Sequence, residues 1–195
     1  AAFDVTIATA AGITLVGNMS VNGGTANFRV RRLSSSTVSV TRLESSSSAS
    51  QIMIVRDEKS NGIDGGTFTA GAWRTRDLND VTFNTIVGAS LGSNRITLPV
   101  GTYSIKAFAP AYQVDKHKAK LANITDSSDA IIGSAEVSVN GPTKSIIEGT
   151  ITITSQKVFE VQHYAGTSRV TNGFGSDAGF STVEVYAIIT IEKIG

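Results

Sequence analysis

Alternation of hydrophobic and polar residues predicts that this chain is built of β-strands. The clearest segment covers residues 102–109, where Tyr103, Ile105 and every second residue after them form one hydrophobic or small face. A period of two is typical of a strand with one buried face. Pro110 is expected to end this strand, because proline has no N–H to donate to a neighbouring strand.

A second extended segment follows directly and has one strongly charged face. One parity carries lysines and the other carries hydrophobic residues and a histidine; the two sets are Lys116, Lys118 and Lys120, and His117, Ala119 and Leu121. Three lysines on one side indicate a strand whose outer face is in contact with water.

Short strands separated by turn residues are predicted along the whole chain. They cover residues 3–8, 13–21, 25–33, 37–43, 51–56, 81–87, 95–98, 130–139, 145–154, 157–164 and 183–193. No segment keeps a helical period over any length. Many short strands spaced in this way predict an all-β sandwich or jelly roll.

One change in composition divides the chain into two parts. Residues 44–50 (ESSSSAS) are rich in serine and are typical of a flexible linker. We therefore predict a small N-terminal β meander over residues 1–43, a linker over residues 44–50 and a jelly-roll domain over residues 51–195. With 195 residues, the chain is long enough for its larger part to bury a full core.

The segment from Leu98 to Thr125 (LPVGTYSIKAFAPAYQVDKHKAKLANIT) resembles the early strands of a tumour-necrosis-factor-like jelly roll that occurs in many bacteriophage virion proteins. Asp64–Asn79 (DGGTFTAGAWRTRDLN) and Glu184–Ile194 (EVYAIITIEKI) are similar to the same family. The resemblance covers about residues 51–195. It implies a trimeric, non-enzymatic head domain on a virion.

The last predicted strand, residues 183–193, is hydrophobic on both faces. Its odd-numbered residues up to Ile191 are hydrophobic, and Tyr186 and Ile188 lie on the other face. A surface strand of a monomer should be polar outside, so this face is expected to be covered. In the resembled family this face is covered by the neighbouring copies at the threefold axis of a trimer. We assign Tyr186, Ile188, Tyr103 and His163 to that interface; the alternative is a strand covered by its own N-terminal segment.

Composition narrows the range of partners. The chain has 17 basic and 16 acidic residues, so no strong field favours nucleic acid or an anionic membrane. No hydrophobic run approaches the roughly 18 residues that span a bilayer. The absence of cysteine excludes disulfides and thiolate metal sites, and it fits folding in a reducing cytoplasm. The N-terminus, AAFDVTIATAAG, is a poor signal peptide because it lacks a basic start and carries Asp4.

No catalytic residue, metal site or cofactor is predicted. His117 and His163, the only histidines, both fall on hydrophobic faces, so we interpret them as hydrogen-bonded core or interface residues. A metal site would need a third ligand nearby. Asn123 is expected to cap the turn before Asp126.

Three carboxylates leave a hydrolase open as an alternative. Glu136, Glu148 and Glu160 lie on separate predicted strands, and a pair of carboxylates is the machinery of a glycoside hydrolase. Glu160, however, lies on the face opposite Phe159 and Val161, which indicates a solvated surface residue.

Two further segments carry candidate binding residues. The glycine-rich loop over residues 165–181 mixes aromatic, cationic and amide groups that suit a glycan or protein receptor, namely Arg169, Asn172, Phe174, Asp177 and Phe180. The alternative is a loop whose phenylalanines enter the core. The N-terminal meander is too small to be stable alone, so it is expected to bind the particle through Phe3, Phe28, Arg29, Arg31 and Arg32.

The resemblance, together with these patterns, favours a trimeric capsid decoration protein of the cement or head-fibre type. It would be made in the host cytoplasm, displayed on the virion surface and attached to the major capsid protein or another virion protein. The alternative is a tail-fibre head that recognises a host surface glycan or protein. Such a head usually carries a long shaft or adaptor, for which residues 1–48 are too short unless the chain is a fragment. A glycan-active enzyme is the most distant alternative.

Overall fold

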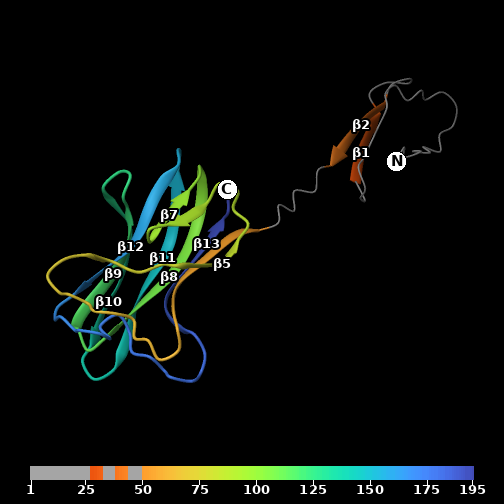
Figure 1. Ribbon diagram of the computed structural model, residues 1–195. Coiled ribbons are helices and arrows are strands. Elements are labelled where there is room, and N and C mark those ends of the chain that lie inside the picture. The colour runs from red at the N-terminus through yellow and green to blue at the C-terminus, as the bar shows by residue number, and fades with distance from the viewer. Residues whose placement is uncertain (1–26, 33–37, 44–49) are drawn as a thin grey trace. The chain divides into compact units, whose positions relative to one another are not determined.

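The computed structural model describes residues 27–32, 38–43 and 50–195, and the chain divides into two compact units, residues 1–49 and 50–195 (Figure 1). In the first unit, β1 (Asn27–Arg32) and β2 (Val38–Leu43) pair in antiparallel fashion. They confirm the strands predicted over residues 25–33 and 37–43. The strands predicted over residues 3–8 and 13–21, and the anchoring residue Phe3, lie outside the described residues.

The second unit is a sandwich of two antiparallel sheets, which confirms the all-β prediction (Figure 1). One sheet has the order β11-β8-β13-β3-β5, and the other has the order β10-β9-β12-β7-β6 with β4 paired to β12. No described residue belongs to a helix that could span a membrane. The strands are β3 (Gln51–Lys59), β4 (Arg74–Thr75), β5 (Asp80–Asn84), β6 (Ser90–Gly92), β7 (Arg95–Leu98), β8 (Gly101–Tyr112), β9 (Asp115–Asn123), β10 (Ser128–Ser138), β11 (Pro142–Ile153), β12 (Lys157–Ala165) and β13 (Glu184–Lys193).

The core lies between the two sheets and is made by alternate residues of their strands. In β8, every second side chain from Tyr103 to Ala111 is buried, as the alternation predicted. Ala119 and Leu121 of β9, with Phe159 and Val161 of β12, contribute from the opposite sheet. Successive residues of a strand point to opposite faces of a sheet. Because the hydrophobic residues of one parity form the inner face, the residues of the other parity form the outer surface of each sheet.

The prediction that Pro110 ends its strand is wrong, since β8 continues to Tyr112. Beyond Phe108, β8 pairs with β11 but no longer with β13. The carbonyl oxygen of Pro110 instead accepts a hydrogen bond from Arg76 Nη1 (3.0 Å). In an antiparallel strand the backbone nitrogen and carbonyl of one residue point to the same side. The nitrogen of Pro110 therefore points to the side of β8 where β13 no longer pairs, so no neighbouring strand loses a hydrogen bond there.

The lysine face of β9 is not uniformly solvated, which corrects a second expectation. Lys116 is exposed and Lys118 is half-buried, whereas Lys120 is only 8% exposed. Lys120 Nζ donates to Asp129 Oδ1 (2.5 Å) and lies 4.3 Å from the ring centre of Trp73. Trp73 lies just before β4, which pairs with β12, so a segment distant in sequence covers this lysine.

Candidate binding surfaces

The outer face of the five-stranded sheet carries large hydrophobic residues. Ile146 of β11 lies opposite Phe108 of β8, and Phe108 lies opposite Ile188 of β13. On the same sheet Ile54 pairs with Phe83. Ile146 and Phe83 are each 48% exposed. A sheet face in contact with water is expected to be polar, so this face is a candidate contact surface.

Three of the four residues assigned to a trimer interface are buried inside the folded chain itself, so this assignment is corrected. Tyr103 is fully buried and its hydroxyl donates to the carbonyl of Pro99 (2.7 Å). His163 is fully buried, and Tyr186 is 4% exposed with its hydroxyl bonded to the carbonyl of Ile63 (2.7 Å). Ile188 alone of the four lies on the outer face.

A β-bulge explains the error at Tyr186. The pairing of β13 with β3 shifts between Val185 and Ile188. Tyr186 and Ala187 are consequently both buried, although they are neighbours in sequence. A bulge inserts one residue into a strand and reverses which parity points inward. Strict alternation, counted along the whole strand, therefore placed Tyr186 on the wrong face.

The two histidines form a buried pair at the inner face, where their parity placed them. His117 Nδ1 lies 2.9 Å from His163 Nε2, and His117 Nε2 lies 2.7 Å from Thr143 Oγ1. Nδ1 of His163 has no hydrogen-bond partner among the described residues. Burial, with smaller contributions from Arg76 and His117, lowers the pKa of His163 to about 2, and burial lowers the pKa of His117. Both rings are therefore neutral at pH 7.

Acidification is expected to destabilise the fold through His163. The unfolded chain binds a proton on this histidine below about pH 6.5, whereas the folded chain does not until near pH 2. The free energy of unfolding should therefore fall as the pH drops below about 6.5, by about 2 kcal/mol at pH 5.

Chemical unfolding of wild type and a His163→Gln variant at pH 7 and pH 5 measures this effect. The raised pKa of Asp57, caused mainly by burial, acts in the opposite direction as the pH falls, but it is common to both proteins. The loss between the two pH values should be smaller in the variant by about 2 kcal/mol. An equal loss in both proteins would contradict this account.

A buried ion pair holds one end of the sandwich together. Arg76 is fully buried, and its Nη2 lies 3.8 Å from Oδ2 of Asp57, which is 1% exposed. Arg76 also donates to the carbonyls of Pro110 (3.0 Å) and Phe174 (3.1 Å), and its guanidinium lies 4.2 Å from the ring centre of Phe174. One side chain thus ties β3, the end of β8 and the loop after β12. Sequence patterns gave no sign of it.

The expected receptor loop is partly anchored by these contacts. Phe174 stacks on Phe68 with 4.3 Å between ring centres, so the alternative of a phenylalanine packed inward holds for this residue. Arg169 Nε donates to Asn172 Oδ1 (2.9 Å), and the backbone N–H of Asp177 donates to Asp64 Oδ1 (3.0 Å). Phe180, by contrast, is 81% exposed.

Glu160 is buried, so its interpretation as a solvated residue is wrong. Only 5% of it is exposed, and it accepts hydrogen bonds from Arg95 Nε (2.8 Å), Thr75 Oγ1 (3.0 Å) and Gln162 Nε2 (2.9 Å). Arg95 and the segment containing Thr75 cover the outer face of β12 at this point. Glu148 belongs to the other sheet, where it pairs with Lys106 in an exposed contact (3.2 Å).

Two further expectations concern a turn and the N-terminal strand. The cap at Asn123 is confirmed, since its Oδ1 accepts from the backbone N–H of Asp126 (3.1 Å). The anchoring candidates Phe28, Arg29, Arg31 and Arg32 all belong to β1.

No group of three His, Cys, Asp or Glu side chains among the described residues is arranged to hold a metal ion.

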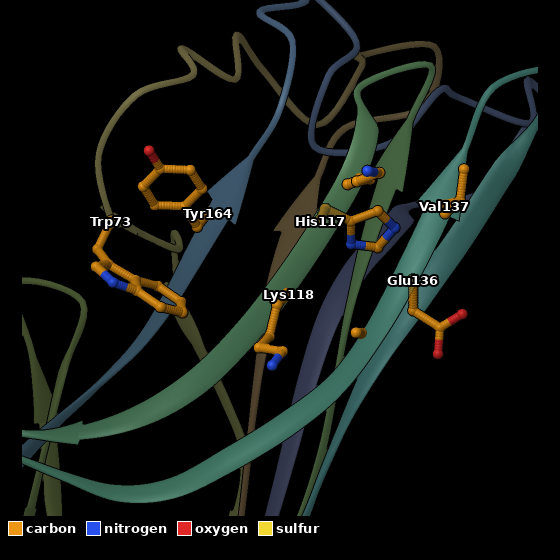
Figure 2. Close-up of a pocket in the computed structure, with 8 residues that line it drawn as sticks. Trp73, His117, Lys118, Glu136, Val137 and Tyr164 are labelled. Carbon is orange, nitrogen blue, oxygen red and sulfur yellow. The ribbon is translucent and has the colours of Figure 1, made fainter.

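An open groove lies on the sheet that contains β9, β10 and β12, and the sequence analysis did not predict it. Its volume is about 780 Å³, and it is lined by Trp73, Tyr164, residues 116–118 of β9 and residues 135–137 of β10. Figure 2 shows Trp73 and Tyr164 on one side of Lys118, with Glu136 and Val137 on the other. Trp73 and Tyr164 meet edge to face, with ring centres 5.7 Å apart.

Comparison with solved structures identifies the fold. The chain is similar to murine APRIL at pH 5.0, with a TM-score of 0.50 and 4% identity over 74% of this chain and 99% of that chain. The chain is also similar to Eiger TNF from S. frugiperda, with a TM-score of 0.49 and 11% identity over 75% of this chain and 93% of that chain. It is similar as well to the globular domain of zebrafish complement 1qA protein, with a TM-score of 0.47 and 13% identity over 75% of this chain and 98% of that chain. No family model and no curated protein matches the sequence. The tumour-necrosis-factor-like jelly roll predicted from the sequence is thereby confirmed as a fold.

Proposed function

We propose that this protein is a non-enzymatic structural protein of a bacteriophage particle, assembled as a homotrimer and displayed on the capsid as a decoration protein. The jelly roll over residues 51–195 forms the trimer, and residues 1–43 attach it to the major capsid protein or another virion protein. The proposal combines the resemblance to phage virion jelly rolls with the surface chemistry of the structure.

The outer face of the five-stranded sheet carries the self-association part of the proposal. Ile146, Phe108 and Ile188 form a row across three adjacent strands, with Ile146 48% exposed. Burying large hydrophobic side chains of this kind stabilises an assembly by about 25 cal/mol per Å² removed from water. A second copy is the partner that is present wherever the chain is made, and the family resemblance specifies three copies.

The N-terminal strand supports the attachment part of the proposal. Arg29, Arg31 and Arg32 are close together in β1, which forms a two-stranded sheet with β2. A two-stranded sheet is marginally stable in water by itself, so it needs a partner surface. An acidic patch on a capsid would attract the three arginines and would also order the sheet.

Deleting residues 1–43 is expected to abolish particle binding while leaving a soluble trimeric head. The test adds purified protein to particles that lack the native protein and measures what co-sediments. Replacing Arg29, Arg31 and Arg32 with glutamate should weaken binding and make the remainder less sensitive to salt. Full binding by the deleted form would locate the attachment site in the jelly roll and contradict the proposal.

The second candidate function is a tail-fibre head that binds a host receptor. The exposed side chains of the loop after β12 favour it, because Phe180 is 81% and Val170 is 70% exposed. Electron microscopy of particles labelled through this protein distinguishes the two, since decoration predicts label over the head and a fibre head predicts label on the tail. A glycan-active enzyme has less support, because Glu148 and Glu160 lie on different sheets.

A further inference from the structure

The groove beside Trp73 has the size and lining of a ligand site. Its volume of about 780 Å³ falls in the range of small-molecule pockets, roughly 300–1,000 Å³. It lies on the sheet that contains β9, β10 and β12, whereas the hydrophobic row proposed for self-association lies on the other sheet. A ligand in the groove would therefore not compete with assembly through that row.

The aromatic side of the groove is held in place before any ligand arrives. The Nζ of Lys120 lies 4.3 Å from the centre of the Trp73 ring and is itself fixed by Asp129 (2.5 Å). Tyr164 packs edge to face against the same indole. Trp73 and Tyr164 nevertheless stay 37% and 38% exposed. Aromatic rings carry negative faces, which attract the slightly positive C–H groups of a sugar ring.

Positive charge lies next to this aromatic pair. Lys116 and Lys118 line the groove, and neither forms an ion pair with any residue described in the structure. The one carboxylate of the lining, Glu136, accepts a hydrogen bond from Ser134 Oγ (2.7 Å). His117 is neutral at pH 7 because burial lowers its pKa. Two cations against one carboxylate make the groove attractive to an anion.

The charge of the groove also argues against other occupants. The N-terminal segment of the same chain carries Arg29, Arg31 and Arg32 on β1, so the lysines would repel it. A second copy has its own hydrophobic face on the other sheet. A ligand that offers both ring C–H groups and a negative charge matches the aromatic pair and the lysines together.

We propose that this groove binds an acidic glycan, with a sugar ring on Trp73 and Tyr164 and its carboxylate or sulfate at Lys116 and Lys118. The residues that line this groove include none from the loop after β12. The inference goes beyond the function proposed above and does not depend on it, since neither the trimer nor attachment through residues 1–43 requires the groove.

A glycan array followed by a fluorescence titration tests the inference on the protein of 195 residues. The array carries sialylated, uronic-acid-containing and sulfated oligosaccharides beside their uncharged counterparts. We expect binding to charged members and at least tenfold weaker binding to their matched neutral forms. Trp73 is the only tryptophan of the chain, so its emission reports directly on the groove. The strongest array glycan should change that emission saturably.

Variants locate the site. Lys118→Gln should weaken binding at least tenfold and reduce its salt dependence, and Tyr164→Ala should abolish it. Lys106→Gln, an exposed lysine on the other sheet, is the matched control and should bind like wild type. Phe180→Ala should also bind normally. Thermal melting of each variant verifies that it is folded.

Several outcomes would overturn the inference. These are an array without any bound glycan, equal binding of charged and neutral members, wild-type affinity in Lys118→Gln, or loss of binding in Phe180→Ala, which would place the site in the loop. Particle binding and the mass of the assembly are measured separately, so failure here leaves the proposed structural function intact.

Discussion

Replacing Ile146 or Ile188 with aspartate is expected to convert the proposed trimer into folded monomers. Both side chains lie on the outer face of the five-stranded sheet, where Ile146 is 48% exposed in the isolated chain and tolerates a polar group. In the assembly, each substitution would bury one unpaired carboxylate in every copy. A buried, unpaired charge costs several kcal/mol. The summed cost of three such carboxylates, one in each copy, should therefore exceed the free energy that stabilises the interface.

The matched control is Ile132→Asp. Ile132 is 52% exposed on β10 of the other sheet, so the substitution is chemically the same and its site is about as exposed as that of Ile146 (48%). It should leave a trimer. Light scattering measures the mass of each variant, and circular dichroism verifies its fold. A trimer that survives both Ile146→Asp and Ile188→Asp would exclude this face as the interface.

Tyr186→Asp should behave differently from these two variants. Tyr186 is 4% exposed within its own subunit, and its ring lies so close to Gly175 that a Cβ there would be 2.3 Å from Cδ1. An aspartate at this position should unfold the chain instead of releasing a folded monomer, because it leaves a cavity and a buried charge.

Replacing Arg76 with methionine is expected to lower the free energy of unfolding by about 3–5 kcal/mol, because it removes one of the two cations beside a buried carboxylate and the donor to two backbone carbonyls. Asp57, 1% exposed, would retain only Lys59 (3.1 Å) as a cation, and the carbonyls of Pro110 and Phe174 would each lose a donor. Urea unfolding at one fixed protein concentration measures the loss, since the stability of an oligomer depends on concentration.

A double-mutant cycle separates the ion pair from the hydrogen bonds. Asp57→Asn combined with Arg76→Met should cost less than the sum of the two single changes, because the buried charge is removed with its partner. Arg74→Met, which removes one surface hydrogen bond to Thr69, should cost about 1 kcal/mol or less. Additive losses in the cycle, or a loss below about 1 kcal/mol for Arg76→Met, would contradict the account.

The period-two pattern predicted most of the sandwich because inner-face residues of regular strands must be hydrophobic. It succeeded along β8, where every second side chain from Tyr103 is buried. It failed at Tyr186, because a bulge in the pairing of β13 with β3 reverses the parity within the strand. A bulge depends on pairing between distant segments, and no local pattern marks it.

Burial of charged residues could not be predicted in the same way. Lys120 and Glu160 lie on the outer parity of β9 and β12, yet segments around Trp73 and Arg95 cover them. Arg76 is buried by partners at Pro110 and Phe174. In each case the covering residue is distant in sequence from the residue it covers, so its position is set by tertiary packing. The groove was missed for the same reason, because Trp73 and Tyr164 meet only in the folded chain.

Light scattering over a range of concentrations measures the mass of the 195-residue protein in solution and so decides whether it forms a trimer. We expect three times the 20.3 kDa of one chain, maintained as the protein is diluted into the micromolar range. A mass of 20.3 kDa under the same conditions would contradict this expectation, and the hydrophobic outer face of the five-stranded sheet would then require a different cover.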